Sequence, residues 1–197
     1  MQDITPDQLG AILLLETISA TIALLVSHYS NKAFRFTQQK RLADLSTGFL
    51  VLSAGMYGRV LGILYAAVSS NLETLTIVVI ATSFMRIMAY VLFVVSTRHT
   101  ISKMTPELVM FMQIPLLVDF NLETVGLILL VIVVLQSLMN YMSTRSRYGL
   151  YVLVGFVLLL LSHSAIVTNS GYLLSQILQL LAFLALLVML LKVGREE

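Results

Sequence analysis

Four ionisable residues stand inside otherwise apolar stretches of the sequence: Glu16, Arg59, Arg86 and His163. Where such a stretch crosses a membrane, an ionisable side chain is costly and usually faces the interior of a helix bundle, so each marks a candidate functional site. Because pairing offsets much of the cost of a buried charge, we expect an ion pair between Glu16 and Arg59, which lie on consecutive stretches. Arg86 has no obvious acidic partner.

Two roles are open for these four residues. In the first, Arg59 and Arg86 bind an anionic ligand in a pocket that faces outward. Glu16 then acts as the counter-ion, and His163 forms a titratable wall. The expected hydroxyl lining comes from Tyr57 and Tyr90. In the second role the same side chains only hold helices together, through polar contacts that average about 0.6 kcal/mol in membranes.

Other chemistries find less support in the residues present. His28 and His99 stand at the inner ends of apolar stretches, where two histidines can ligate a haem, but two interfacial histidines among basic residues explain them with fewer assumptions. No histidine has a second metal ligand one helical turn away, and cysteine is absent. No Asp or Glu shares the stretch of His163, so a serine-hydrolase arrangement is unsupported. We expect neither catalysis nor a cofactor or metal.

The composition of the chain indicates whether these residues lie in water or in a membrane. Of the 197 residues, 58% are hydrophobic and 11% are charged, whereas soluble domains have about 45–50% and about 25%. The chain is therefore expected to be an all-α, polytopic integral membrane protein with a single membrane domain over residues 1–197. Six stretches are long enough to cross as helices: 9–27, 42–68, 75–96, 122–142, 148–168 and 172–193.

A seventh, shorter stretch at 105–120 opens with Thr105-Pro106-Glu107, which is typical of a helix start. Its length of about 24 Å is less than the hydrocarbon thickness of about 30 Å. If it crosses, the loops that carry Lys and Arg all fall on one side. We therefore predict seven helices with a short fourth one, in the cell membrane, with the N-terminus outside and the C-terminus in the cytoplasm. A surface helix with six crossings is the alternative.

The two ends of the chain also show a weak internal repeat. Residues 48–52 (GFLVL) parallel residues 155–159 (GFVLL), and Arg98 parallels Arg195. Two halves, 9–99 and 122–195, joined by a linker helix at 105–120, would form a 3+1+3 parallel pseudo-repeat. This plan resembles the sugar-efflux semi-transporters of the SWEET type in helix count and orientation. The Pro-Gln dipeptide that marks the first helix of each half in that group is absent here.

Three small residues on the second stretch, Gly55, Gly58 and Gly62, are spaced so that a neighbouring helix can approach closely. With no catalytic motif present, we expect a non-catalytic structural or accessory subunit of a larger membrane complex, in contact with lipid and with other membrane subunits or copies of itself. The alternative is a small-solute transporter or a ligand-sensing seven-helix module. Basic residues confined to short loops predict no nucleic-acid partner.

Overall fold

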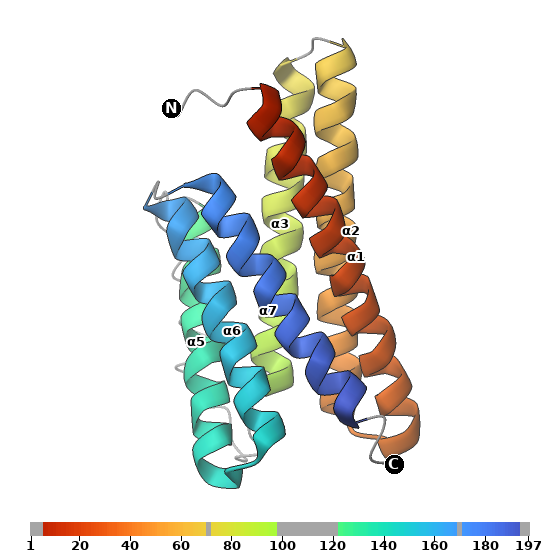
Figure 1. The fold of residues 1–197 in the computed structure, drawn as a ribbon, viewed down its shortest axis with the longest axis vertical. Helices are drawn as coiled ribbons and strands as arrows, with labels where there is room; N and C mark the ends of the chain where they lie inside the picture. The colour runs from red at the N-terminus through yellow and green to blue at the C-terminus, as the bar shows by residue number, and fades with distance from the viewer. Residues whose placement is uncertain (1–5, 70–71, 98–121, 169–170, 194–197) are drawn as a thin grey trace.

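The computed structural model describes residues 6–69, 72–97, 122–168 and 171–193, and nearly all of them are α-helical. Each described helix is long and apolar enough to cross a membrane, so the predicted all-helical fold with six long apolar helices is confirmed. The helices in Figure 1 are α1 (Pro6–Thr37), α2 (Lys40–Ser69), α3 (Leu72–Thr97), α5 (Leu122–Thr144), α6 (Arg147–Val167) and α7 (Tyr172–Val193).

The first helix is longer than the sequence predicted. The expected span ended at residue 27, but α1 continues to Thr37, because residues 28–37 contain neither glycine nor proline to end it. The chain then turns at Gln38, whose φ of 56° is uncommon for a residue other than glycine. Arg145, between α5 and α6, makes a turn of the same kind with a φ of 47°.

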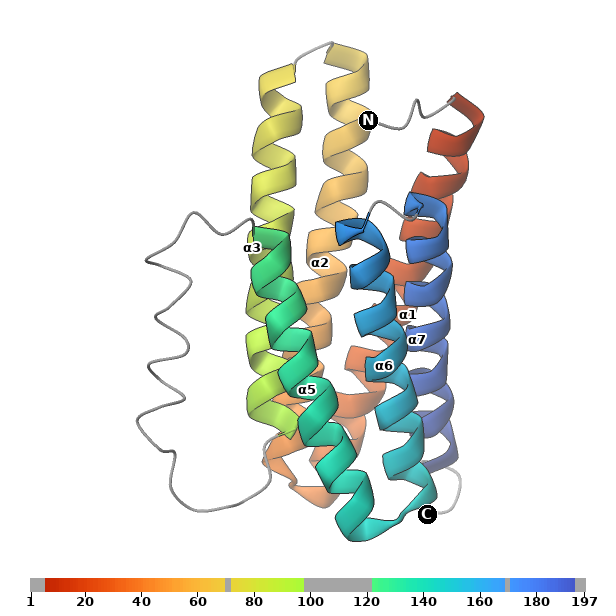
Figure 2. The ribbon, with the colours of Figure 1, turned by 90° about the vertical axis from the view of Figure 1, so that its left-hand side faces the viewer.

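The described helices form a closed ring in which each packs against the next along the chain and α7 packs against α1 (Figures 1 and 2). The middle of the bundle contains four fully buried phenylalanines, one each from α2, α3, α6 and α7: Phe49, Phe93, Phe156 and Phe183. Their ring centroids lie 4.7 Å apart for Phe49 and Phe93, 5.7 Å for Phe49 and Phe183, and 5.5 Å for Phe93 and Phe156. Such aromatic pairs add about 0.5–1.5 kcal/mol each beyond the area they bury.

Helices α3 and α5 run in the same direction, and α5 is displaced along α3 (Figure 2). Thr97, the last residue of α3, donates a hydrogen bond to the side chain of Gln136 at 2.7 Å. Gln136 lies fourteen residues after Leu122, so the start of α5 lies about 21 Å back along α3 from the end of that helix. The expected helix at 105–120 falls between them and lies outside the described residues.

Two of the three glycines predicted to pack helices do so. A Cβ atom at Gly55 would lie 3.1 Å from the Cβ of Met85, and a Cβ at Gly62 would overlap the side chain of Val78, both on α3. A Cβ at Gly58 would meet no described atom within 4 Å. Close packing along α2 is therefore directed at α3 through Gly55 and Gly62, and Gly58 takes no part in it.

Candidate functional site

The ion pair expected between the first two helices is present. Arg59 Nη1 lies 3.5 Å from Glu16 Oε1, and the Glu16 side chain is only 2% exposed. On its other side the Arg59 guanidinium lies over the ring of Tyr172, 5.0 Å from the ring centroid. Tyr172 is the first residue of α7. Arg59 thus connects α1, α2 and α7 at one level of the bundle.

Arg86 has an acidic partner that the sequence did not indicate. Its Nη1 lies 3.3 Å from Glu123 Oε2, and Ser83 Oγ donates a 3.3 Å hydrogen bond to Glu123 Oε1. The sequence placed Glu123 near the outer end of its stretch, far in depth from Arg86. The displacement of α5 along α3 brings the first turn of α5 level with the middle of α3, and this offset cannot be read from hydropathy.

The histidine of α6 joins this second ion pair. His163 is 3% exposed, and its Nε2 lies 2.8 Å from the backbone oxygen of Glu123 and 3.3 Å from Glu123 Oε2. The ring of Tyr90 meets the imidazole edge to face, at 5.8 Å between centroids. Gly126 makes room for it, because a Cβ there would lie 3.0 Å from His163 Nε2. The structure therefore places His163 and Tyr90 beside Glu123 rather than beside Glu16.

Together these contacts form a layer across the bundle to which every described helix contributes one residue. We call this set the polar layer: Glu16, Arg59, Arg86, Glu123, His163 and Tyr172. Its two guanidinium groups and two carboxylate groups balance in formal charge. Each of its arginines lies beside one of its carboxylates, which is the arrangement that makes buried charges tolerable in a medium of low dielectric constant.

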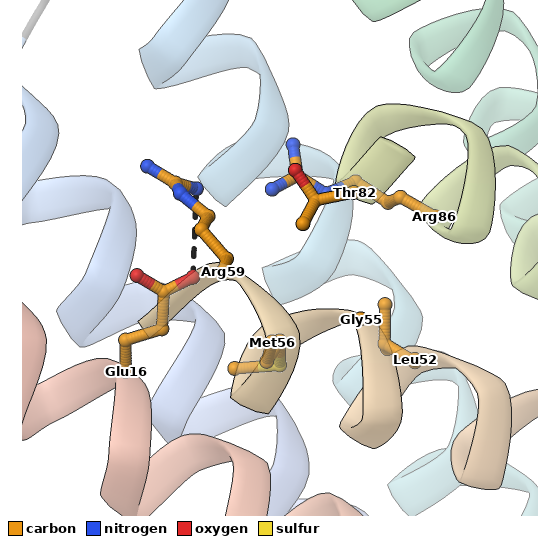
Figure 3. A pocket seen from close by; sticks show the side chains of 7 residues that line it. All are labelled: Glu16, Leu52, Gly55, Met56, Arg59, Thr82 and Arg86. Carbon is orange, nitrogen blue, oxygen red and sulfur yellow. Dashed lines mark ion pairs between the residues drawn. The ribbon is translucent and has the colours of Figure 1, made fainter. Parts of the chain in front are cut away.

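A small pocket separates the two arginines (Figure 3). It is lined by Glu16, Leu52, Gly55, Met56, Arg59, Thr82 and Arg86, and the guanidinium groups of Arg59 and Arg86 both point toward it. The space measures about 200 Å³ with its open mouth included, and its inner part, about 10 Å³, has room for one water-sized group. The pocket can therefore hold water or one end of a small polar solute.

Several buried polar atoms near this layer have no hydrogen-bond partner within the described part of the chain. Glu16 Oε2 is one of them, and it is turned away from the ion pair that Oε1 makes (Figure 3). The others on α1 and α7 are Ser19 Oγ, Tyr172 Oη and Gln176 Oε1, together with Ser30 Oγ further along α1. Sequence reasoning missed Tyr172 and Gln176, although their four-residue spacing within an apolar stretch places both on one face of a helix.

The remaining predicted residues lie elsewhere. Tyr57 is half-buried and hydrogen-bonds Thr21 through its hydroxyl at 2.7 Å, so it joins α2 to α1 and does not line the pocket. His28 is exposed and contacts the ring of Tyr29 edge to face, whereas His99 lies outside the described residues. Across the described ranges no three His, Asp or Glu side chains are placed to hold a metal ion.

A comparison of the chain with protein-family models, with curated proteins and with solved structures found no match. The fold and the polar layer are therefore the observations from which a function is inferred.

Proposed function

We propose that this polytopic membrane protein is a small-solute transporter or ligand-sensing module, and that its ligand site is the pocket of the polar layer. One observation carries the proposal. Two guanidinium groups from different helices and a buried carboxylate line a single pocket inside a helix bundle of membrane-spanning length. Ionisable side chains at such positions are costly, and they commonly mark the path of a substrate or ion.

The hydrogen bonding of Glu16 supports a ligand site over a purely structural ion pair. A carboxylate that only clamps two helices gains most when both of its oxygens are bonded. Glu16 contacts Arg59 through Oε1 at 3.5 Å, and Oε2 has no protein partner in the described ranges. An unbonded buried oxygen costs about 1–3 kcal/mol, a cost that a bound polar molecule removes.

The helix directions favour seven crossings. Because α3 and α5 are parallel, the start of α5 at Leu122 lies about 21 Å back along the bundle from the end of α3 at Thr97. This distance is close to the length of a helix at 105–120. Basic residues gather at the end of the bundle where α1, α5 and α7 finish: Lys32, Arg35, Lys40, Arg41, Arg145, Arg147 and Lys192. We place this end in the cytoplasm and the N-terminus outside.

The 3+1+3 pseudo-repeat gains support from two corresponding turns. One constant residue separation relates Gln38 to Arg145, the left-handed residues that end the first helix of each half. The same separation relates Gly48 to Gly155, where the second helix of each half meets the third closely. The polar layer draws residues from both halves, and a site between parallel repeats is typical of transporters of this plan.

An accessory subunit of a larger complex is the second candidate. The four buried phenylalanines close the middle of the bundle, and the inner pocket holds one water-sized group. Gly58 and Leu61, which is 65% exposed, lie on a part of α2 that another membrane helix could cover. We propose no catalytic role, resident cofactor or nucleic-acid partner for either candidate.

Solvent access to the pocket distinguishes the two candidates. The chain has no cysteine, so a Thr82→Cys variant carries one thiol, on the pocket wall. The matched control is Val133→Cys, because Val133 is fully buried in α5. We expect a water-soluble, membrane-impermeant thiol reagent to modify the first variant and spare the second, as judged by mass spectrometry. An unreactive Thr82→Cys thiol would favour the accessory subunit.

A further inference from the structure

Resting on the ligand site proposed above, we propose that the pocket of the polar layer binds a single small halide ion, such as chloride, together with a proton that Glu16 holds. The halide lies between the guanidinium groups of Arg59 and Arg86, which come from different helices and both point toward this pocket (Figure 3).

The two arginines have hydrogen-bond donors to spare. A guanidinium group has five N–H groups and accepts no hydrogen bond. Arg59 contacts Glu16 through Nη1, and Arg86 contacts Glu123 through Nη1. Within the part of the chain that the structure describes, the Nε and Nη2 groups of both arginines therefore have no carboxylate acceptor. An anion between the two guanidinium groups supplies that acceptor.

The ion pairs leave positive charge available to an anion. Arg59 Nη1 lies 3.5 Å from Glu16 Oε1, and Arg86 Nη1 lies 3.3 Å from Glu123 Oε2. Charge-assisted hydrogen bonds between such groups are shorter, at about 2.7–2.9 Å. Neither carboxylate thus holds its arginine in close contact, and an anion in the pocket is attracted by two guanidinium charges at once.

The size of the pocket favours a monatomic anion. Its inner part, about 10 Å³, has room for one water-sized group. The smallest halides, fluoride and chloride, are the anions nearest to water in size, and they place their whole charge in that inner space. A polyatomic anion such as acetate has to extend into the open mouth of the pocket.

The charge balance of the polar layer requires a proton with the halide. The two arginines and two carboxylates cancel, so a halide alone would leave a net negative charge in a medium of low dielectric constant. Glu16 is the acid that lines the pocket, and its Oε2 atom has no hydrogen-bond partner among the described residues. A proton can bind there without displacing a hydrogen bond. Glu123 does not line the pocket, and Ser83 and His163 contact its carboxylate.

The groups around Glu16 leave it as the one that takes up the proton. They are Arg59 from α2, Arg86 from α3 across the pocket, and Tyr172 from α7, whose ring lies against the Arg59 guanidinium. The arginines stay protonated and the tyrosine stays neutral at physiological pH. One proton bound with each halide means that the halide affinity falls by about tenfold for each pH unit over which Glu16 is ionised.

Chloride-35 NMR of the full-length protein in detergent tests this inference. We expect the protein to broaden the chloride signal, and the affinity obtained from a chloride titration to fall as the pH rises. Fluoride should compete and remove the broadening, whereas acetate and gluconate at equal concentration should leave it unchanged. Competition by acetate as strong as that by fluoride would overturn the monatomic ligand.

Two pairs of variants assign the roles. Glu16→Gln should bind chloride at least as tightly as the native protein and independently of pH, whereas Glu73→Gln, which alters an exposed acid, should keep the native pH dependence. The double variant Glu16→Gln/Arg59→Gln should bind chloride at least about tenfold more weakly than Glu16→Gln, because one charged donor is lost. Arg147→Gln, an exposed arginine, should leave the affinity unchanged.

The outcomes separate this inference from the proposed function. Chloride binding without pH dependence in the native protein would overturn the coupled proton, and a signal no broader than that of detergent alone at every pH would overturn the halide. In both cases a reactive Thr82→Cys thiol would leave the ligand site standing. An unreactive Thr82→Cys thiol together with no chloride binding would contradict the proposed function as well.

Discussion

Glu123 lies in the first turn of α5, yet its carboxylate contacts Arg86 near the middle of α3, at 3.3 Å. This contact exists because α5 is displaced along α3, and it brings the second ion pair level with the pair of Glu16 and Arg59. The stagger of one helix therefore creates the polar layer, and it assembles residues from both ends of the chain around one pocket.

Removing the carboxylate of Glu16 should destabilise the protein. Glu16→Ala removes the residue of the polar layer that forms an ion pair with Arg59. Breaking a buried pair in this way costs about 3–5 kcal/mol. For a chain of this size, about 3 kcal/mol corresponds to a fall in melting temperature of roughly 6–12 °C. Thermal unfolding in detergent measures this fall in melting temperature. The double variant Glu16→Gln/Arg59→Gln should recover most of the loss, and an unchanged melting temperature for Glu16→Ala would contradict a buried pair.

Glu123→Ala should also destabilise the protein, because Glu123 is shared between Arg86 and His163. Glu73→Ala serves as the control, since Glu73 also lies in the first turn of a helix but is exposed. We expect the melting temperature to fall by several degrees for Glu123→Ala and by less than about two for Glu73→Ala. An equal fall in melting temperature for the two variants would mean that Glu123 stabilises the protein only by its position at a helix N-terminus, and not through Arg86 and His163.

The sequence predicted the membrane-type helices and the pair of Glu16 and Arg59, because hydropathy and charge placement are local properties of the chain. It did not predict the partner of Arg86, because the relative displacement of two helices depends on packing between residues far apart in sequence. It likewise gave His163 no acidic neighbour, and the contact with Glu123 exists for the same reason. Counting residues along two helices gives the relative depth of their side chains only when the helices start at the same level, and α5 starts beside the middle of α3.

Replacing Gln176 by leucine should make the protein more stable. Gln176 is 2% exposed and its Oε1 atom has no protein partner in the described ranges, so an apolar side chain of similar volume removes a buried unbonded group. We expect a gain of about 1 kcal/mol in the free energy of unfolding, which thermal unfolding in detergent measures. A loss of stability would show that the Gln176 amide is satisfied within the protein.

Two glycines of α2 provide a matched packing test. In Gly62→Ala the new methyl group overlaps Val78, whereas in Gly58→Ala it meets no described atom. We expect Gly62→Ala to cost about 1–3 kcal/mol and Gly58→Ala to be neutral or slightly stabilising, since alanine is the better helix former. Adding Val78→Ala should rescue the first variant. A costly Gly58→Ala would instead indicate that another subunit packs on this face.

The proposed topology is tested at the two left-handed turns. Single-cysteine variants at Gln38 and Arg145 should both react with an impermeant reagent from the cytoplasmic side only, because the two turns lie at the same end of the bundle. Ser69→Cys, at the opposite end of α2, should react from the outside. Labelling of Gln38→Cys and Arg145→Cys from opposite sides would contradict seven crossings.

The most direct test of the ligand site is an experimental structure in lipid at a resolution that shows ordered water. We predict non-protein density in the pocket between Arg59 and Arg86, within hydrogen-bond distance of the Glu16 carboxylate. A pocket without such density, in which protein donors bond both oxygens of Glu16 directly, would contradict the proposed ligand site.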